Sequence, residues 1–310
     1  MNSLWDEVVS GKIIKFLTEI EGTQTKVPVT IIGGTADGPS VLITTGIHGS
    51  EFPATAAAIE LGSELQPADI KGRLIMLHPV NTRGFQARVS MIMPEDGFNL
   101  NRAFPGDPEG RASFKLAWWL TGLSDKADFY LDLHSGDLYE ELTPYVYYPG
   151  NAEEKVVETS RAAAMVLDMP YMVRSGAATG AYNSAALRGT PSLLLERGGA
   201  GFCRDEEIAL YKQDIRSLLI HLGMMSGQPT TTAGPRELTK VIYLESKYNA
   251  CWRSAVSPGQ KLEAGMLLGR TFDFFGNIIA EYRAEMEGVV LYQLYPLSTN
   301  PGDVLVAYGA

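Results

Sequence analysis

The chain has 310 residues, of which 45% are hydrophobic and 20% are charged, a composition typical of a globular protein and not of a disordered one. Its length exceeds what a single core usually holds, which predicts one large domain and a smaller one. Acidic residues number 36 and basic residues 26, so the net charge of −10 argues against nucleic acid or an anionic membrane as a partner.

The N-terminal segment has neither a basic region nor an apolar stretch of the kind found in signal peptides. No apolar run in the chain approaches the length needed to span a bilayer. We therefore expect a cytoplasmic protein. Cys203 and Cys251 lie far apart and form no C-x-x-C pair, which fits reduced thiols better than a disulfide framework.

Short apolar runs rich in β-forming residues alternate with amphipathic helical stretches between about residues 26 and 225. The expected strands cover residues 27–32, 41–45, 73–77, 129–133, 144–148 and 192–195, and the expected helices cover residues 53–65, 111–123, 153–167 and 205–225. This alternation predicts an α/β fold in which helices flank a largely parallel or mixed sheet. Functional loops of such a sheet gather at the carboxyl ends of its strands.

Residues 226–235 are rich in Gly, Pro and Thr, and the helical periodicity disappears after them. We interpret this segment as a linker between a catalytic domain at residues 1–228 and a C-terminal domain at residues 236–310. Two Pro-Gly turns in the C-terminal part, at 258–259 and 301–302, each lead into a short strand. This duplication predicts a compact all-β barrel or sandwich.

The C-terminal pattern resembles biotinyl and lipoyl carrier domains. The turn at residues 273–276 reads D-F-F-G, however, and has no lysine at its tip, so a carrier function is not expected. We expect this domain to act as a lid or as an oligomer surface, and an exposed β-domain would suit a homodimer.

Two of the expected strands are followed by histidines. Residues 41–45 run into G-I-H-G-S-E, which places His48 and Glu51 just before a helix, and residues 129–133 run directly into His134. Two histidines and a glutamate are one of the ligand sets of catalytic zinc, which keeps its fourth position for water. These residues therefore predict one Zn²⁺ per chain and a hydrolytic reaction. The alternatives are a helix N-terminal charge for Glu51 and a loop cap for His134.

The other two histidines, His78 and His221, fit structural positions better than ligand positions. Asp132 lies two residues before His134 on the same strand, from where it could orient a metal-binding imidazole. Glu196 ends the run 192–195. A carboxylate at the end of a buried strand is costly unless it is paired or functional, so Glu196 is the best candidate for a general base.

Two alternatives concern neighbouring cations. Glu196 could instead form a salt bridge with Arg197, which follows it directly. Asn101 and Arg102 offer an amide and a planar guanidinium that could grip a substrate carboxylate, although such a pair alone is an ordinary surface dipeptide. Beside a zinc site the pair becomes a specific candidate for carboxylate recognition.

Five motifs in order carry a family resemblance: G-x-H-G-x-E at 46–51, P-x-N at 79–81, N-L-N-R-x-F-P-G at 99–106, D-L-H-S-G at 132–136 and L-E-R-G-G at 195–199. Over residues 25–225 the chain resembles the succinylglutamate desuccinylase/aspartoacylase branch of the zinc carboxypeptidase superfamily. The series is far more specific than any one of its motifs.

The resemblance implies a role for each matching position. His48, Glu51 and His134 would be the zinc ligands, and Glu196 would be the general base and then the general acid. Asn101 with Arg102 would clamp the substrate carboxylate, and Arg88 would polarise the scissile carbonyl. The C-terminal β-domain would limit access to the site.

The chain also departs from the family pattern. Arg197 stands where an apolar residue is common, and it could depress the pKa of Glu196 or bind a substrate anion. Arg188 resembles a substrate-contacting arginine of aspartoacylases, at a different spacing from Glu196.

We therefore expect a zinc-dependent amidohydrolase that cleaves the amide bond of an N-acyl amino acid or of a related small metabolite carrying a carboxylate. One alternative is a metallocarboxypeptidase that acts on short peptides. The other is a catalytically silent relative that binds metal, against which the presence of Glu196 argues. G-x-S-x-G and the nucleotide-binding glycine motifs are absent from the sequence.

Overall fold

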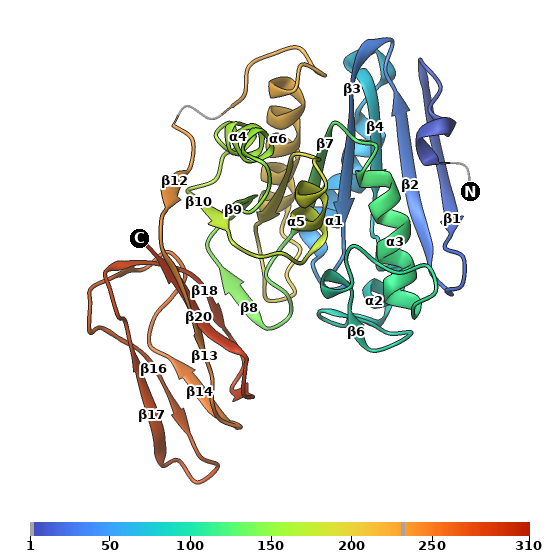
Figure 1. The fold of residues 1–310 in the computed structure, drawn as a ribbon. Coiled ribbons are helices and arrows are strands. Elements are labelled where there is room, and N and C mark those ends of the chain that lie inside the picture. The colour runs from blue at the N-terminus through green and yellow to red at the C-terminus, as the bar shows by residue number, and fades with distance from the viewer. Residues whose placement is uncertain (1–2, 231–232) are drawn as a thin grey trace.

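The computed structural model describes residues 3–230 and 233–310, and its centre is a nine-stranded mixed sheet (Figure 1). The strand order is β1-β2-β4-β3-β7-β11-β9-β10-β12. These strands are β1 (Lys12–Glu19), β2 (Lys26–Gly33), β3 (Ala36–Thr45), β4 (Lys71–Leu77), β7 (Phe129–His134), β9 (Tyr145–Pro149), β10 (Tyr171–Ser175), β11 (Ser192–Glu196) and β12 (Arg236–Leu238).

Strands β4, β3, β7 and β11 are parallel neighbours at the centre of this sheet. The register pairs Thr45 of β3 with Leu133 of β7, and His134 of β7 with Glu196 of β11. The carboxyl ends of the three strands therefore meet at one edge, where functional loops of an α/β sheet gather.

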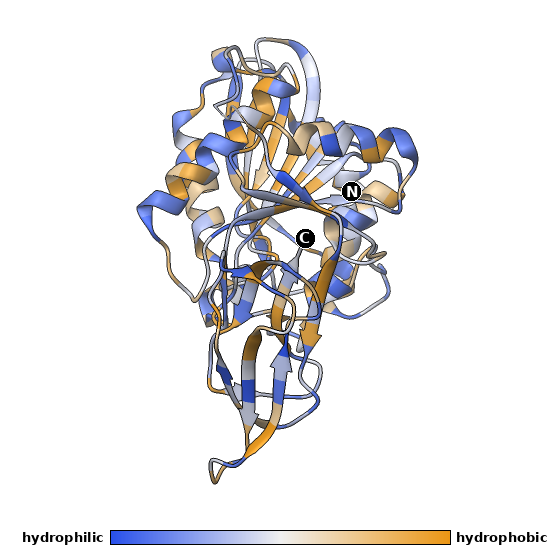
Figure 2. Cartoon of the chain, turned by 90° about the vertical axis from the view of Figure 1, so that its left-hand side faces the viewer, coloured by the Kyte–Doolittle hydropathy of each residue, from blue (hydrophilic) through white to orange (hydrophobic). Residues whose placement is uncertain are grey.

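Both faces of the large sheet are covered, which explains why its central strands are almost continuously apolar (Figure 2). Val41 and Ile43 pack into the core that α1, α4 and α6 cover, whereas Leu42 between them packs into the core under α3 and α5. The helices are α1 (Phe52–Glu64), α2 (Thr82–Ala87), α3 (Ala112–Ser124), α4 (Glu154–Ala164), α5 (Ala181–Leu187) and α6 (Asp205–His221), with short 3-10 helices at Leu4–Glu7, Pro67–Asp69 and Leu100–Arg102.

All six expected strands and all four expected helices are present, which confirms the predicted α/β class. Helix α6 ends at His221 and not at residue 225, because Gly223 adopts a left-handed φ of 75° that turns the chain. Strands β1 and β10 and the short helices α2 and α5 were not predicted. Helices of six or seven residues are too short to leave a clear periodic pattern.

The C-terminal part consists of two antiparallel sheets that share one apolar core. Trp252 and Leu268 from one sheet pack with Val290 and Leu305 from the other, so this part is built as a sandwich. The strands are β13 (Val241–Glu245), β14 (Ala250–Ser254), β15 (Lys261–Leu262), β16 (Leu267–Phe272), β17 (Ile278–Arg283), β18 (Gly288–Leu294), β19 (Ser298–Thr299) and β20 (Val304–Gly309).

The C-terminal part is joined to the large sheet by strand pairing and by a shared apolar cluster. Strand β8 (Glu140–Leu142) follows β7 in the chain and pairs with β18, while β12 pairs with β10 in the large sheet. Tyr145 and Val173 pack against Leu291 and Ala307. The chain thus leaves the large sheet after β12, slightly later than the predicted boundary at residue 236.

Within the described ranges, none of the helices combines the length and apolarity that crossing a membrane requires. Cys203 and Cys251 are free thiols, as expected. Residues 231 and 232 of the predicted linker lie outside the described residues. The remaining strands, β5 (Ile92–Met93) and β6 (Phe98–Asn99), form a small hairpin that leads into the Asn101-Arg102 segment.

Candidate active site

The turn after β3 brings His48 and Glu51 to the site. Gly46 adopts a left-handed φ of 64°, and a Cβ at this position would collide with the Cβ of Pro79, so the turn requires glycine. The chain then reverses, and Glu51 becomes the residue that precedes α1, with Pro53 in the first helical turn. The expected strand-to-helix corner is thus present.

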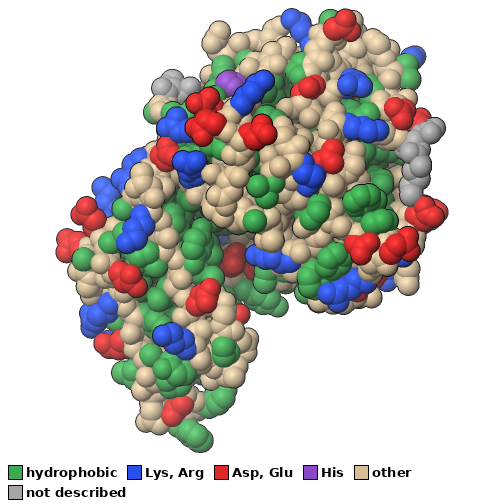
Figure 3. Space-filling view, viewed as in Figure 1, with side chains coloured by type: hydrophobic (Ala, Val, Ile, Leu, Met, Phe, Trp, Pro, Cys, Tyr) green, Lys and Arg blue, Asp and Glu red, His purple; other side chains and the backbone are tan. Residues whose placement is uncertain are grey.

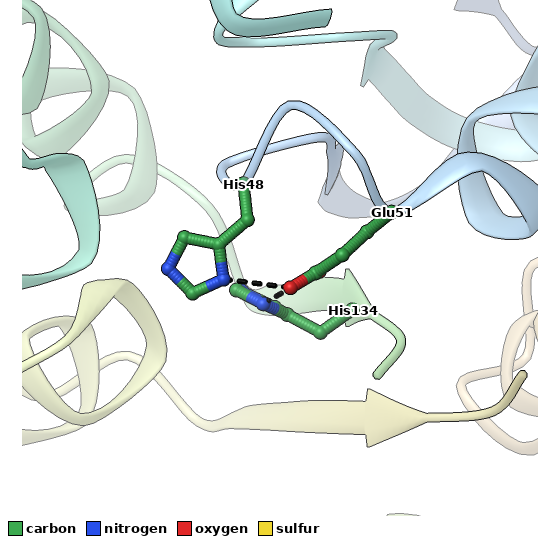
Figure 4. A group of neighbouring side chains, drawn as sticks. All are labelled: His48, Glu51 and His134. Carbon is green, nitrogen blue, oxygen red and sulfur yellow. Dashed lines mark hydrogen bonds and ion pairs between the residues drawn. The ribbon is translucent and has the colours of Figure 1, made fainter. Parts of the chain in front are cut away.

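The side chains of His48, Glu51 and His134 converge on one point (Figure 4). Glu51 Oε1 lies 2.7 Å from Nδ1 of His48, and Glu51 Oε2 lies 3.0 Å from Nδ1 of His134. One potential ligand atom from each residue lies within 4.8 Å of the other two, and all three residues are buried. This spacing suits a single cation.

The far nitrogen of each imidazole faces an oxygen acceptor. Nε2 of His48 lies 3.3 Å from Oδ1 of Asn99, and Nε2 of His134 lies 3.2 Å from Oδ2 of Asp132. An imidazole that donates its Nε2–H to such an oxygen keeps its Nδ1 lone pair for a metal. Because both Nδ1 atoms point toward the same carboxylate, the donor set fits a divalent metal, and Asp132 occupies the orienting position expected for it.

The electrostatics of the three residues are those of a charged cluster. Burial alone would raise the pKa of Glu51, but the imidazoles of His134 and His48 lower it to about 2. Burial opposes the charging of His134, yet the carboxylates of Glu51 and Asp132 raise its pKa well above the ordinary value. In this arrangement a proton on His134 takes the place that a metal cation would hold.

Glu196 lies beside His134 on the adjacent strand and lines the same cavity. Its Oε2 is buried and has no hydrogen-bond partner among the described residues. Burial raises the pKa of Glu196 well above its ordinary value, His134 lowers it, and the charges of Glu51 and Glu140 raise it further. An unpaired, buried carboxyl group beside a metal-binding cluster is suited to proton transfer.

These residues line a cavity of about 450 Å³. One wall comes from the carboxyl ends of β7 and β11, and a second comes from the C-terminal part, which contributes Tyr243, Glu245 and Tyr292. Figure 3 shows a recess between the body and the C-terminal part, with acidic side chains inside it. A volume of this size suits a small metabolite.

Asn101 and Arg102 both line the cavity, as the carboxylate-clamp hypothesis requires. Asn101 is buried, and its Oδ1 accepts a hydrogen bond of 2.9 Å from the backbone N–H of Ala181. The guanidinium of Arg102 donates to the backbone carbonyl of Asn101 at 3.2 Å. Helix α5 therefore holds the Asn101 amide in place while Arg102 remains exposed to the cavity.

Arg88 does not lie where its expected role requires. It is an exposed residue with a left-handed φ of 52°, it ends α2, and it is not among the cavity-lining residues. The structure therefore gives its expected role no support.

The two arginines expected to contact substrate are also engaged elsewhere. Arg197 is buried and forms an ion pair of 2.8 Å with Asp214 of α6, so it neither lines the cavity nor pairs with Glu196. Arg188 pairs with Asp125 at 2.6 Å beside the end of α3. Arg197 thus ties α6 to the end of β11, and Arg188 ties the end of α5 to the end of α3, so the substrate roles expected for them are not supported.

The remaining histidines are outside the cluster. His78 is partly buried, and its Nε2 lies 2.9 Å from the hydroxyl of Thr30, whereas His221 is exposed at the end of α6. Neither lines the cavity, which agrees with the structural positions expected for them.

Several residues of the cavity carry no recognisable signal in the sequence. Glu140 comes from the short strand β8, and four tyrosines come from β9, α5, β13 and β18. Nothing local marks such residues, because a lone glutamate or tyrosine in a strand is ordinary and only the tertiary fold brings them together. These tyrosines are Tyr147, Tyr182, Tyr243 and Tyr292.

Comparison with known proteins agrees with the motif series. Residues 37–222 match the family model of the succinylglutamate desuccinylase/aspartoacylase catalytic domain. The chain is 31% identical over 289 residues to the N-alpha-acetyl-L-2,4-diaminobutyric acid deacetylase of Halomonas elongata, an alignment that covers 90% of this chain and 84% of that protein.

Solved structures share the fold over nearly the whole chain. The product-bound ectoine utilization protein EutE (DoeB) from Ruegeria pomeroyi superposes with a TM-score of 0.85 at 26% identity, covering 96% of this chain and 94% of that one. A succinylglutamate desuccinylase/aspartoacylase from Rhodobacter sphaeroides superposes with a TM-score of 0.83 at 28% identity, covering 92% and 90%. The likeness includes the C-terminal part as well as the catalytic part.

Proposed function

Because this chain belongs to the succinylglutamate desuccinylase/aspartoacylase family, we propose that it hydrolyses the amide bond of an N-acyl amino acid, or of a related small metabolite, with one Zn²⁺ per chain. The observation that carries the proposal is the convergence of His48, Glu51 and His134 beside the unpaired carboxyl of Glu196. The first three would hold the metal. When bound, Zn²⁺ supplies Lewis acidity, which polarises a carbonyl oxygen and acidifies water.

Asn99 and Asp132 hold the two imidazole rings in the orientation that leaves each Nδ1 free. Asp132 is itself fixed by a hydrogen bond of 2.7 Å from the hydroxyl of Thr44 on β3. Such outer contacts keep ligand atoms in place and raise metal affinity. Asp132 thus ties His134 to the central sheet, while Asn99 supports His48 from the hairpin of β5 and β6.

Glu196 transfers a proton from the attacking water to the leaving amine. As a carboxylate it takes a proton from the attacking water, and as a carboxylic acid it returns that proton to the leaving amine. Its unpaired Oε2 supports this role, because a carboxyl group already held by hydrogen bonds or an ion pair would be a poor base. Asn101 and Arg102 bind the α-carboxylate of the substrate through their amide and guanidinium groups.

The size of the cavity favours a small substrate over a peptide. Tyr243, Glu245 and Tyr292 limit it on the side of the C-terminal part. A metallocarboxypeptidase needs room for the rest of the peptide chain beyond its site, so a cavity of about 450 Å³ bordered by the C-terminal part favours an N-acyl amino acid. The Halomonas elongata relative is named as a deacetylase, and acetyl is accordingly the first acyl group to test.

Turnover of a mixed panel by zinc-loaded protein tests this proposal. The panel contains N-acetyl, N-succinyl and longer N-acyl amino acids beside dipeptides and hexapeptides, and mass spectrometry identifies the products. Release of acid from N-acyl amino acids alone, lost in the Glu196→Gln variant, is the expected result. Removal of C-terminal residues from the peptides alone would identify the protein as a carboxypeptidase. Absence of turnover of every substrate in the panel would favour a family member that has lost its activity.

A further inference from the structure

Strand β1 forms one end of the nine-stranded sheet and, among the described residues, pairs with β2 alone. Its eight residues pair with β2 without a register shift, and they include neither proline nor glycine. The backbone N–H and C=O groups along such an open edge can pair with another strand. The C-terminal part follows β12 at the opposite end of the sheet, so a strand added at β1 would lie away from it (Figure 1).

The backbone groups of Lys15, Leu17 and Glu19 point toward this open edge. The backbone N–H of Ile20 donates to the carbonyl of Thr25, just before β2, at 3.2 Å. Successive residues of an antiparallel strand direct their N–H and C=O groups to alternate sides. The even-numbered residues of β1 therefore bond to β2, and the odd-numbered ones face outward.

Pro28 of β2 agrees with this orientation. It stands opposite Leu17 in the register, and proline has no N–H that could donate to β1. Its carbonyl accepts a hydrogen bond of 3.2 Å from the backbone N–H of His78, on the side away from β1. Leu17 therefore has no backbone hydrogen bond to its neighbour in β2, and its own N–H and C=O are directed to the open edge.

The side chains of β1 leave an apolar group uncovered at the middle of this edge. Ile13 packs against the core that α1 covers, and Nζ of Lys15 on the same face lies 3.5 Å from the hydroxyl of Ser63 in α1. Leu17 continues this row and is 61% exposed. A single exposed leucine is ordinary on a surface. This one, however, lies midway between Lys15 and Glu19 on the same face of the strand.

The sequence of β1 is complementary to itself in one antiparallel register. A two-fold axis perpendicular to the sheet keeps every side chain on its own face, so a residue of one copy can stand opposite only a residue of the same parity. With Leu17 on the axis, Lys15 of each copy stands opposite Glu19 of the other, and Phe16 stands opposite Thr18. Opposite charges in directly opposed positions stabilise a strand pair.

Neighbouring registers lack this complementarity. Lys15 on the axis would stand opposite its own copy, and like charges in that position are unfavourable. Phe16 on the axis would place Glu19 opposite Ile13 and leave both lysines uncompensated. Glu19 has an ion pair of 2.7 Å with Lys26 in its own chain, but its side chain remains 75% exposed, which leaves it accessible to a second cation.

Strand β17, at the end of a sheet in the C-terminal part, is less suited to pairing. Its register with β16 shifts twice, between Leu267 and Gly269 and between Thr271 and Phe272. Such bulges twist an edge strand and hinder the addition of another strand. Strand β12, at the other end of the large sheet, has only three residues. Strand β1 is therefore the best candidate among these edges.

We propose that the outer edge of β1 binds the same edge of a second copy of this chain, so that two large sheets join into one across a two-fold axis at Leu17. Backbone hydrogen bonds connect the two Leu17 residues, and others connect Lys15 of each copy with Glu19 of the other. The two Lys15–Glu19 ion pairs fix the register. This inference does not depend on the proposed function, because β1 contributes no residue to the catalytic cavity.

The mass of the full chain in solution is the first test. Sedimentation velocity over a series of protein concentrations should show a species of twice the chain mass of 33.7 kDa, which dissociates on dilution. A mass of one chain up to the highest soluble concentration would overturn the inference.

Charge reversal tests the register. Lys15→Glu and Glu19→Lys each place like charges opposite each other at two positions, so each should raise the dissociation constant of the dimer on the order of tenfold. An equimolar mixture of the two variants should recover the dimer, because every mixed pair contains two Glu–Lys contacts. Within one chain, positions 15 and 19 lie about 13 Å apart along the strand, so recovery on mixing cannot arise inside a chain. Dimers of wild-type stability in both variants, or no recovery on mixing, would contradict the inference.

Glu281→Lys is the matched control, because it reverses an exposed glutamate on β17, the edge strand of the C-terminal part. It should leave the dimer unchanged. Loss of the dimer in Glu281→Lys and not in Lys15→Glu would assign the interface to the C-terminal part and overturn the inference. Leu17→Pro is a second variant at the axis. It removes the N–H that faces the second copy and not one that bonds to β2, a position at which edge strands accept proline, so it should also give monomers that unfold at the wild-type temperature.

Discussion

The two walls of the cavity differ in origin and in chemistry. The first is formed by the carboxyl ends of β3, β7 and β11 and carries His48, Glu51, His134 and Glu196. The second is formed by β8 and by strands of the C-terminal part. The first brings together the residues proposed to hold the metal and to transfer the proton, whereas the second contributes carboxylate and aromatic side chains to the cavity. We therefore expect the second wall to influence the choice of substrate more than the chemistry.

This division predicts different effects of substitution in the two walls. Parallel neighbours fix the strand ends of the first wall, so a small shift there would disturb several ligand atoms at once. Tyr243 and Tyr292 project from another sheet, where replacement need not alter the metal ligands. If the division is correct, variants in the first wall should abolish turnover and variants in the second should redistribute it.

The largest effect is expected at Glu196. Glu196→Gln keeps the size of the side chain but removes the base, so kcat should fall by about 10²–10⁴-fold. Steady-state kinetics on an N-acyl amino acid measures the loss, and zinc content should stay unchanged. Glu141→Gln, on the exposed side of β8, is the control. Retention of more than about a tenth of the wild-type rate would remove Glu196 from the mechanism.

His48→Ala should abolish tight zinc binding because it removes one of three ligands. The change should exceed the 10–100-fold typical of losing a residue that only orients a ligand. A competition titration with a chromophoric chelator measures the affinity, and His221→Ala, at the exposed end of α6, should leave it unaltered. Equal affinity in both variants would contradict the proposed ligand set.

The two exposed arginines near the site should behave differently. Arg102 lines the cavity and Arg88 does not, so Arg102→Ala should raise KM by about 10–100-fold through loss of a charged hydrogen bond, while Arg88→Ala should change kinetics by less than about threefold. A loss of kcat in Arg88→Ala as large as that in Glu196→Gln would return Arg88 to the role of polarising the carbonyl.

The dependence of the free energy of unfolding on pH tests whether the Glu140 carboxylate is held in an unfavourable environment by burial and by the charges of Asp137 and Glu51. Its pKa is about 8 in the folded protein, against 4.5 for an unperturbed glutamate, so the folded state holds a proton that the unfolded state loses between these values. Stability of the metal-free protein should therefore fall as pH rises from 4.5 to 8, with up to about 1.4 kcal/mol per pH unit from this group.

Glu140→Gln should flatten that decline, and thermal unfolding at several pH values measures it. Asp137 and Glu196, whose pKa values burial also raises, add to the decline in both proteins, whereas Glu51, whose pKa is lowered to about 2, is ionised in the folded and the unfolded state over this range and does not change the slope. The difference between wild type and variant isolates the contribution of Glu140. Parallel curves for the two proteins would mean that Glu140 is not held in an unfavourable environment.

The smallest effect on stability and turnover is expected from the hydrogen bond between Tyr147 of β9 and Tyr243 of the C-terminal part. Tyr243→Phe removes the hydroxyl that meets Tyr147 at 2.8 Å, and a single hydrogen bond contributes about 0.5–1.5 kcal/mol. Unfolding free energy should fall by that amount, and kcat should change by less than about threefold. A loss of activity comparable to that of Glu196→Gln would show that the C-terminal part takes part in the chemistry.

The first wall could be predicted from sequence because its residues occur in short contiguous motifs at strand ends. His48, Glu51, His134 and Glu196 each follow an apolar run, and parallel strands bring such positions together. Asn101 and Arg102 could be predicted as an amide and guanidinium pair within one contiguous motif.

The second wall could not be predicted because its residues meet only through tertiary structure. Glu140 and Tyr292 are far apart in the chain and become neighbours when β8 pairs with β18. The error at Arg197 has a related cause: adjacency to Glu196 suggested a role at the site, but alternate residues of a strand end point to opposite sides, and Asp214 lies on the other one. Arg188 is likewise paired with a residue that is distant in the chain.

Zinc titration of metal-stripped protein, with turnover of an N-acyl amino acid as the readout, tests the central claim most directly. The account predicts no activity without metal, a linear rise in rate with added zinc to one equivalent per chain, and no rise in His48→Ala. Full activity in the metal-free protein, or an equal rise in His48→Ala, would show that the cluster of His48, Glu51 and His134 is not the centre of the reaction.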